Sequence, residues 1–416
     1  MSIIIYTKRF WKDRKMKKTI KVHTKLNIYV LYVVSIILIY FLPRFKVTLP
    51  YVLVGMWMLI FLIPSYKCNM KSRNFIYILL ASSIYIFIAD IFIADVSIID
   101  SLNEFIRNIR FYIPLLFLIF FMKNPNKHYI KQIIIAFIGI NGYILYKTYS
   151  ALIKDQWITR VLAKSKMLDT PELRNLRLQN VGGFEFSYMI GVVTICLTWT
   201  TFKAKNKKIK ICSGIMALIT YLYIIKTMYT TLLLLTTFGI MLVILFNLKH
   251  PVTKIAVVAG FIMMFTLLPA VFLRLSEIFS ESLLSTKFIQ MHDALTGGGV
   301  NALGTRSIHL ENAFEIWMKN PIFGGFAKDT KSHSFIMSIL EKNGLIGFLI
   351  FVSLIIRAKN IVCWYLKNNK TSVILFYIVL VYMLLLSFLN PIGYIFEITI
   401  TVFFIVPLWA YLIDNT

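Results

Sequence analysis

The sequence predicts an all-α protein that crosses a membrane about 12 times as one domain. Two observations predict this fold. Of the 416 residues, 58% are hydrophobic, which is more apolar surface than a water-soluble domain of this length can bury. The apolar residues also fall in runs of about 20, the length that an α-helix needs to cross a bilayer, and short polar or basic loops separate these runs.

The apolar runs give the expected spans in chain order. They are 26–42, 49–66, 75–97, 111–122 with its flanks, 130–150, 183–202, 211–226, 228–247, 255–273, 334–356, 372–390 and 394–413. Residues 1–25 precede them as a basic cytoplasmic tail, and 26–416 form the membrane domain. No cleavage site of small residues follows Leu26–Leu42, so we expect this run to stay as the first span rather than to be removed as a signal peptide.

Basic residues in every second loop predict the orientation, because loops rich in Lys and Arg stay in the cytoplasm. The basic segments are the tail, 67–73, 123–131, 203–210, 249–254 and 357–370. Nearly all carboxylates lie in the alternate loops. We therefore expect both termini to lie in the cytoplasm. The net charge of +27 reflects this topology, and we expect no nucleic-acid partner.

Two of the outward loops are longer than connectors need to be. They run from about 155 to 183, before the sixth span, and from about 274 to 333, between the ninth and tenth spans. The second loop contains Gly297-Gly298-Gly299, where the chain can turn sharply. We expect both loops to lie on the extracytoplasmic side.

The sequence has no pattern for a metal or nucleotide site. Its four cysteines lie in apolar runs or near cytoplasmic helix ends, so we expect neither disulfides nor a Cys/His metal site. No Asp-x-Asp pair is present to hold a divalent ion and a nucleotide sugar. No Walker-type glycine loop is present either, which argues against an ATP-driven pump. We expect no metal and no cofactor.

The second long loop holds a short amphipathic segment from Arg306 to Lys319. Its apolar residues form one face and its polar residues the other, which is typical of a helix at the membrane surface with Trp317 as anchor. The apolar residues are Ile308, Ala313, Phe314, Ile316 and Trp317, and the polar ones are His309, Glu311, Asn312 and Glu315. Asn320-Pro321 ends this helix, and Gly324-Gly325 turns the chain.

A histidine heads the tenth span. Lys331-Ser332-His333-Ser334 opens it, and Glu341 and Asn343-Gly344-Leu345-Ile346-Gly347 lie inside it. With Arg306, the Phe314/Trp317 helix and the Asn-Pro-Ile-Phe-Gly segment, this order of residues resembles the O-antigen ligase and polymerase family. The motif covers 304–347, and the expected number of spans extends the similarity over the whole chain.

The resemblance implies a protein of the bacterial inner (cytoplasmic) membrane. It also implies a metal-independent transfer of a glycan from undecaprenyl pyrophosphate to an acceptor sugar on the extracytoplasmic face of that membrane. His333 is then the base that takes the acceptor proton, and Arg306 holds the pyrophosphate. No carboxylate is placed as a covalent nucleophile, so direct attack inverts the anomeric carbon. The implied partners are the lipid-linked glycan, an acceptor glycan or glycolipid and membrane lipids, with other polysaccharide assembly proteins as further candidates.

One position departs from the family pattern. Members usually have a Ser/Thr-Arg pair at the start of the eighth span, whereas this chain has Tyr229-Thr230-Thr231 there and no arginine. Lys226, about one helical turn earlier, is a candidate for the missing charge, although an ammonium group lacks the guanidinium fork. Arg177 and Arg174 in the first long loop are the other candidates.

Three functions fit these residues. A polymerase adds the growing chain to the next lipid-linked unit, and the Asn-Pro-Ile-Phe-Gly segment, the His-Ser start of the tenth span and the room in the first long loop favour it. A ligase that joins O-antigen to lipid A core uses the same chemistry. A transporter or flippase for lipid-linked sugars is less favoured, because polar residues concentrate in outward loops and no inverted repeat is visible.

Each site residue also has a structural interpretation. His333 is explained by a local hydrogen bond at a helix start, and Arg306 by contact with lipid phosphates. Basic side chains near an interface commonly reach toward headgroups, which applies to Arg174, Arg177 and Lys226. Asp90 and Asp95, in the outer half of the third span, are functional candidates because acids inside spans are rare.

Overall fold

The protein is a bundle of helices in the part of the chain that the structure describes. This computed structural model describes residues 30–48, 70–92, 97–123, 125–155, 157–164, 170–227, 229–280, 283–296, 303–324, 334–367, 369–390 and 395–415. Every regular element within these ranges is helical. Eight helices there are long and apolar enough to cross a membrane, or nine if a bent helix is counted, so the all-α polytopic fold is confirmed.

The candidate spans follow one another along the chain, with further helices between them. The spans lie in α5 (Met70–Phe92), α6 (Ile98–Lys123), α7 (Lys127–Lys154), α11 (Lys207–Thr227), α12 (Thr230–Asn247), α16 (Phe335–Leu366), α17 (Lys370–Leu389) and the continuous run of α18 (Phe396–Ile400), η1 (Thr401–Ile405) and α19 (Val406–Asn415). Helix α13 (Pro251–Ile278) bends by 44° and counts as the ninth. A shorter apolar helix covers Val30–Phe41.

Most predicted spans coincide with a helix, but the number of 12 is not confirmed. The predicted span 183–202 is a helix that is not among the candidate spans of the described residues. Two further points differ. The run 49–66 and the tail 1–25 lie outside the described residues. Helix α6 begins at Ile98, well before the expected residue 111, because its polar first half is also helical. That half packs on α5, where the Asn108 amide donates to the Ser83 hydroxyl at 2.8 Å and the rings of Phe87 and Phe105 lie 6.1 Å apart.

Helix α10 (Phe184–Lys203) lies at the centre of the bundle, in contact with α11, α12, α17 and α18. Close packing is possible because Gly191 faces the Thr236 side chain, where a Cβ atom would lie only 2.7 Å from the Thr236 hydroxyl oxygen. Buried hydrogen bonds join the helices. The Trp409 indole N–H donates to the Thr200 hydroxyl at 2.9 Å, and the Tyr382 hydroxyl donates to the Tyr188 carbonyl at 3.1 Å.

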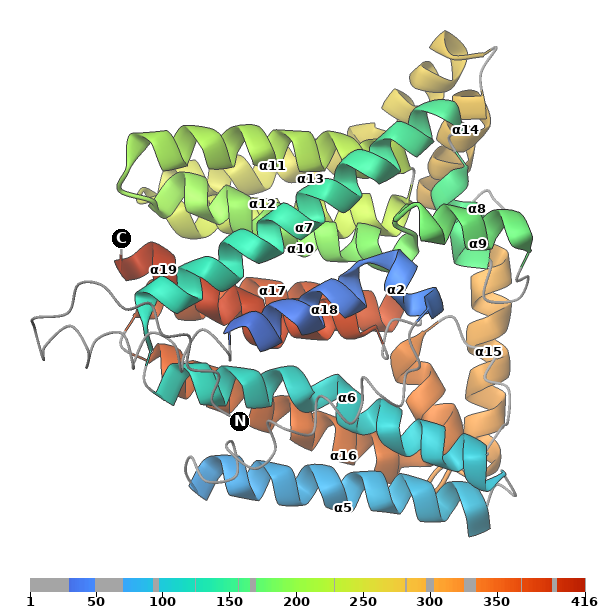
Figure 1. The fold of residues 1–416 in the computed structure, drawn as a ribbon. Coiled ribbons are helices and arrows are strands. Elements are labelled where there is room, and N and C mark those ends of the chain that lie inside the picture. Colours follow the sequence, from blue (N-terminus) through green and yellow to red (C-terminus); the bar gives the residue numbers. More distant parts are fainter. Residues whose placement is uncertain are drawn as a thin grey trace, which may run out of the picture.

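The bundle has two chemically different ends. At the basic end, on the left of Figure 1, α6, α10, α12 and α16 finish and α7, α11, α13 and α17 begin. Exposed lysines lie in or beside its turns, and none of the side chains described in those turns is a carboxylate. At the opposite end, which we call the α15 end, lie the short helices α2 (Pro43–Thr48), α8 (Ile158–Lys164) and α9 (Pro171–Leu178), together with α15 (Leu303–Lys319).

Candidate functional site

Helix α15 carries Arg306 and lies across the ends of the spanning helices instead of along them (Figure 1). Ala313 is buried against the protein, whereas Ile308 and Phe314 are exposed. The expected division into one apolar and one polar face is therefore incomplete, because Ile308 and Phe314 share the exposed side with Glu311. A mixed side of this kind suits a membrane surface, where headgroups and acyl chains are both in reach. The side chain of Arg306 lies outside the described part of the structure.

A tight turn follows α15 at Asn320–Gly324. The Asn320 N–H donates to the Trp317 carbonyl at 3.0 Å, and the Gly324 N–H donates to the Asn320 carbonyl at 2.7 Å. Pro321 cannot continue a helix, and its carbonyl accepts the indole N–H of Trp317 at 3.0 Å. Trp317 therefore fixes the turn against the helix, a role that sequence reasoning missed when it assigned this residue only to membrane anchoring.

Helix α16 is interrupted at Gly344, which has φ 61° and ψ −161°. Glycine adopts these angles readily and other residues almost never do. Just beyond the break, the Leu345 N–H donates to the Pro321 carbonyl at 2.9 Å and the Ile346 N–H to the Ile322 carbonyl at 3.2 Å. The turn after α15 thus supplies acceptors for N–H groups that lose their helical partners at the break.

The turn and the break fit together through two glycines. Gly324 has φ 88°, and a Cβ atom on it would lie 2.6 Å from the carbonyl oxygen of Lys342. A Cβ atom on Gly344 would collide with the Gly324 nitrogen and the Ile322 carbonyl oxygen. The two segments that carry the family resemblance, Asn320–Gly324 and Asn343–Gly347, are therefore in direct backbone contact.

The break separates Phe335–Asn343, which we call the outer segment, from the rest of α16. The segment starts at Ser334, whose buried hydroxyl accepts the N–H of Met337 at 3.2 Å and caps the helix. The Phe335 N–H donates to the Asn390 carbonyl at the end of α17, at 3.2 Å. The start of the outer segment is therefore held in place by its own cap and by α17.

The expected base, His333, lies outside the described residues and directly precedes Ser334 in the chain. Helix α15 packs on α16, and α15 and the outer segment both run toward the Gly324–Gly344 contact (Figure 1). At about 1.5 Å per residue, Arg306 lies about 20 Å before the end of α15, and Ser334 about 15 Å before Gly344. The fold thus directs the beginnings of the two elements to the same side of that contact.

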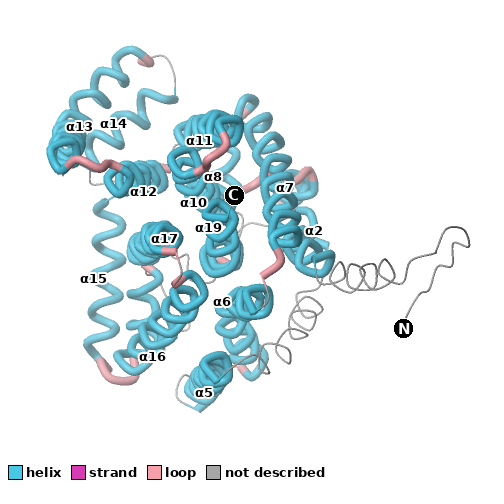
Figure 2. The backbone as a smooth tube through the Cα atoms, turned by 90° about the vertical axis from the view of Figure 1, so that its left-hand side faces the viewer, coloured by secondary structure: helices cyan, strands magenta, loops and turns pink. Residues whose placement is uncertain are grey.

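The other basic candidates lie elsewhere. Arg174 is exposed and Arg177 half-buried on α9, which packs against α2. Figure 2 shows α2 and α15 on opposite sides of the bundle, so the structure does not group the α9 arginines with α15. Lys226 is half-buried in the last turn of α11. It lies close in sequence to Tyr229, whose hydroxyl donates to the Thr159 carbonyl at 2.8 Å beside α8.

Ionisable side chains also occur inside the spans near the α15 end. The Lys342 ammonium of the outer segment lies 3.3 Å from the Glu104 carboxylate of α6, and the two side chains are only 19% and 17% exposed. Asp90 of α5 is 1% exposed and Glu341 is fully buried, and neither carboxyl group has a hydrogen-bond partner in the described structure. Sequence reasoning singled out Asp90 but missed the Lys342–Glu104 pair, because nothing in the sequence links residues so far apart.

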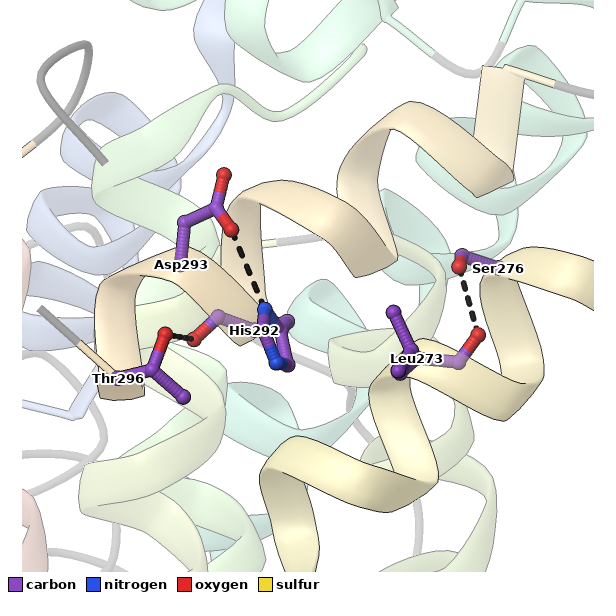
Figure 3. A network of polar contacts seen from close by, with 5 residues as sticks. All are labelled: Leu273, Ser276, His292, Asp293 and Thr296. Atoms are coloured by element: carbon purple, nitrogen blue, oxygen red, sulfur yellow. Dashed lines mark hydrogen bonds and ion pairs between the residues drawn. The ribbon is translucent and has the colours of Figure 1, made fainter. Parts of the chain in front are cut away.

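A second polar network lies in α14 (Leu283–Thr296), which packs against α13 (Figure 3). The His292 ring nitrogen Nδ1 lies 3.2 Å from the Asp293 carboxylate, and the Thr296 hydroxyl donates to the His292 carbonyl at 3.0 Å. These bonds are all local to one helix. They bring no side chain from another element to the His292 ring, so we assign His292 no chemical role.

The described residues contain no group of three or more His, Cys, Asp or Glu side chains that could hold a metal ion. Within that part of the chain, the chemical features of the α15 end are a docked helix break, buried acids and one interhelical ion pair. Compared with models of known protein families and with curated proteins, the sequence has no match.

Proposed function

We propose that this protein is a membrane glycan transferase, a polysaccharide polymerase that moves a glycan from undecaprenyl pyrophosphate to the acceptor sugar of another lipid-linked repeat unit. The observation that carries the proposal is the docking of Asn320–Gly324 on the break at Gly344. It joins the two segments of the family motif. It also explains why Gly324 and Gly344 are glycines, and why the Pro321 carbonyl is free of a helix and can accept a hydrogen bond. A chance likeness of sequence provides no reason for these segments to meet.

The chemistry of the transfer needs a base and a positive charge. In the proposal, neutral His333 takes the proton of the acceptor hydroxyl, whose oxygen attacks the anomeric carbon as the bond to the pyrophosphate oxygen breaks. Arg306 holds the leaving pyrophosphate by paired hydrogen bonds. Arg174 and Arg177 have no part in this pyrophosphate contact, because α9 packs on α2, on the opposite side of the bundle from α15. The proposal keeps Lys226, in the last turn of α11, as the candidate for a further contact with the phosphates.

Membrane orientation is part of the proposal. The basic end faces the cytoplasm, and the α15 end with the catalytic residues faces outward. The exposed lysines at the turns between α6 and α7, α10 and α11, α12 and α13, and α16 and α17 support this orientation, because such clusters remain on the cytoplasmic side. An outward site fits a donor that is a lipid-linked glycan already carried across the membrane.

One observation favours a second candidate, a transporter for lipid-linked sugars. The carboxyl groups of Asp90 and Glu341 are buried within candidate spans without a hydrogen-bond partner in the described structure. Intramembrane acids of this kind commonly mark transport or proton pathways. The transferase remains the preferred function, because a transporter mechanism does not explain why Asn320–Gly324 docks on the break at Gly344.

The test is a gel profile of surface polysaccharide and lipid-linked glycan from cells that lack the gene. These cells are complemented with wild type, His333→Ala or the control His292→Ala, which alters a histidine outside the proposed site. For a polymerase we expect acceptors that bear a single repeat unit in the deletion strain. We expect the control to restore the profile, and His333→Ala to lower the transfer rate by about two to four orders of magnitude.

Other profiles contradict the polymerase in recognisable ways. Bare acceptors together with long lipid-linked chains identify a ligase that joins O-antigen to lipid A core. Lipid-linked units that accumulate on the cytoplasmic leaflet identify a transporter. Full restoration by His333→Ala shows that this histidine is not the base.

A further inference from the structure

The outer segment of α16 is not held by the rest of its own helix. At Gly344 the helical hydrogen bonding stops, and the next two N–H groups bond to Pro321 and Ile322. The direction of Phe335–Asn343 must therefore be set by what it touches. Its end, at Asn343, adjoins the break that bonds to the turn after α15, and its first residue, Phe335, bonds to Asn390.

A lateral contact also holds the segment, at Lys342. This side chain reaches α6, where its ammonium group lies 3.3 Å from the Glu104 carboxylate. The carboxyl group of Asp90 on α5 lies in the electrostatic field of both Lys342 and Glu104. One lysine of the outer segment is thus paired with an acid on α6 and acts at longer range on an acid of α5. We call Lys342, Glu104 and Asp90 the charge clamp.

Removal of one member of the clamp is costly because water is largely excluded from it. Lys342 and Glu104 are each less than one-fifth exposed, and Asp90 is 1% exposed. Screening by solvent is weak at such a site, and removal of one partner leaves an uncompensated charge. By comparison, the Arg274–Glu277 pair on α13 is 81% and 56% exposed, and we expect it to contribute almost nothing.

We infer that Lys342 is a positioning residue, which together with Glu104 and Asp90 sets the angle of the outer segment, the element that directly follows the proposed base in the chain. The inference rests on the proposed function for the role of His333. Lys342 does not supply charge to the pyrophosphate, because its ammonium is already paired with the Glu104 carboxylate. A misplacement of about 1 Å at a reacting group costs about 100-fold in rate.

The experiment compares wild type with Lys342→Met, Lys342→Glu, Glu104→Lys and the exchanged double variant Lys342→Glu/Glu104→Lys. Each protein is purified in lipid nanodiscs, and kcat and KM for the lipid-linked donor are measured along with the melting temperature. We expect Lys342→Met to lower kcat about 100-fold with KM unchanged. We expect the double variant to recover to within about tenfold of wild type, because it restores an oppositely charged pair across the same two helices.

Asp90 allows a further test of the clamp. In the double variant a second carboxyl group is added near the buried Asp90, and two carboxyl groups that share such a site disfavour each other's ionised form. The addition of Asp90→Asn removes this effect, so the triple variant should be faster than the double variant. The control Arg274→Ala should leave kcat and the melting temperature as in wild type.

The outcomes separate the clamp from the proposed function. The clamp is refuted if the double variant is no faster than the slower single variant, or if Lys342→Met keeps the wild-type kcat. If wild type shows no transfer, the proposed function fails. The melting temperatures of the two charge-reversal variants and the double variant then test whether the clamp exists. A double variant more stable than both single variants supports the clamp, and strictly additive losses overturn it.

Discussion

Replacement of Gly344 by alanine tests how the two halves of the motif fit together. At φ 61° and ψ −161° a side chain costs about 1–3 kcal/mol of backbone strain. The added methyl group also collides with the Gly324 nitrogen and the Ile322 carbonyl, and overpacking of this kind costs about 1–3 kcal/mol more. Because both atoms belong to backbone, neither can rotate away. We therefore expect Gly344→Ala to destabilise the protein by about 2–6 kcal/mol.

The assay is thermal unfolding of the protein in lipid nanodiscs, followed by tryptophan fluorescence, together with the rate of glycan transfer. Gly139→Ala is the matched control, since Gly139 lies inside α7 and an added Cβ atom there has no neighbour within 4 Å. Alanine is a better helix former than glycine by about 0.5–1 kcal/mol, so the control should melt at or slightly above the wild-type temperature.

The reasoning fails if Gly344→Ala has the same melting temperature as wild type. Such a result means that α16 closes into a continuous helix without loss, so that the contact with Asn320–Gly324 contributes nothing. If instead both Gly344→Ala and Gly324→Ala lower the melting temperature while their double variant is no worse than either, the two residues act through one shared contact. We expect this non-additive result, because each methyl group alone already separates the turn from the break.

Three further predictions concern separate features. Thr200→Val leaves the buried indole N–H of Trp409 without its acceptor and should lower the free energy of unfolding by about 1–3 kcal/mol, measured by denaturation against Thr198→Val on the half-buried side of the same helix. Arg306→Ala should slow transfer by about 100-fold or more and Arg306→Lys by less, and equal rates for all three proteins exclude a phosphate contact. Chelation of divalent ions with EDTA should leave the transfer rate unchanged, and a loss that Mg²⁺ restores contradicts a metal-independent reaction.

The positions of the spans could be predicted because a bilayer imposes one simple rule on every helix. About 20 apolar residues in succession must be a span, whatever they pack against. The rule fails where a helix is only partly in lipid. The first half of α6 is too polar to be recognised, yet it is helical because its polar residues bond to α5 and α16, as Asn108 does to Ser83 and Glu104 to Lys342.

The candidate site could be predicted only in part. Glycine and proline marked the turn at Asn320–Gly324, since these residue types restrict or free the backbone locally. No local rule says that this turn will insert into a helix break 20 residues further on, because the hydrogen bonds involved join backbone atoms of any residue type. The pattern at Gly344 was read as part of a continuous span, and the break depends on tertiary contact with Pro321 and Ile322.

The helix break explains how the proposed transfer site can lie at the edge of the bundle. A continuous α16 would carry its first turns straight on, away from α15. Because α16 is interrupted at Gly344, the outer segment instead lies alongside α15 (Figure 1). It is held at the break by the backbone of Asn320–Gly324 and on its α6 side by the Lys342–Glu104 pair. Irregular backbone within a candidate span is tolerated only where other groups satisfy it, and the carbonyls of Pro321 and Ile322 meet that requirement. The same hydrogen bonds that make the break possible therefore also determine where the start of α16 lies.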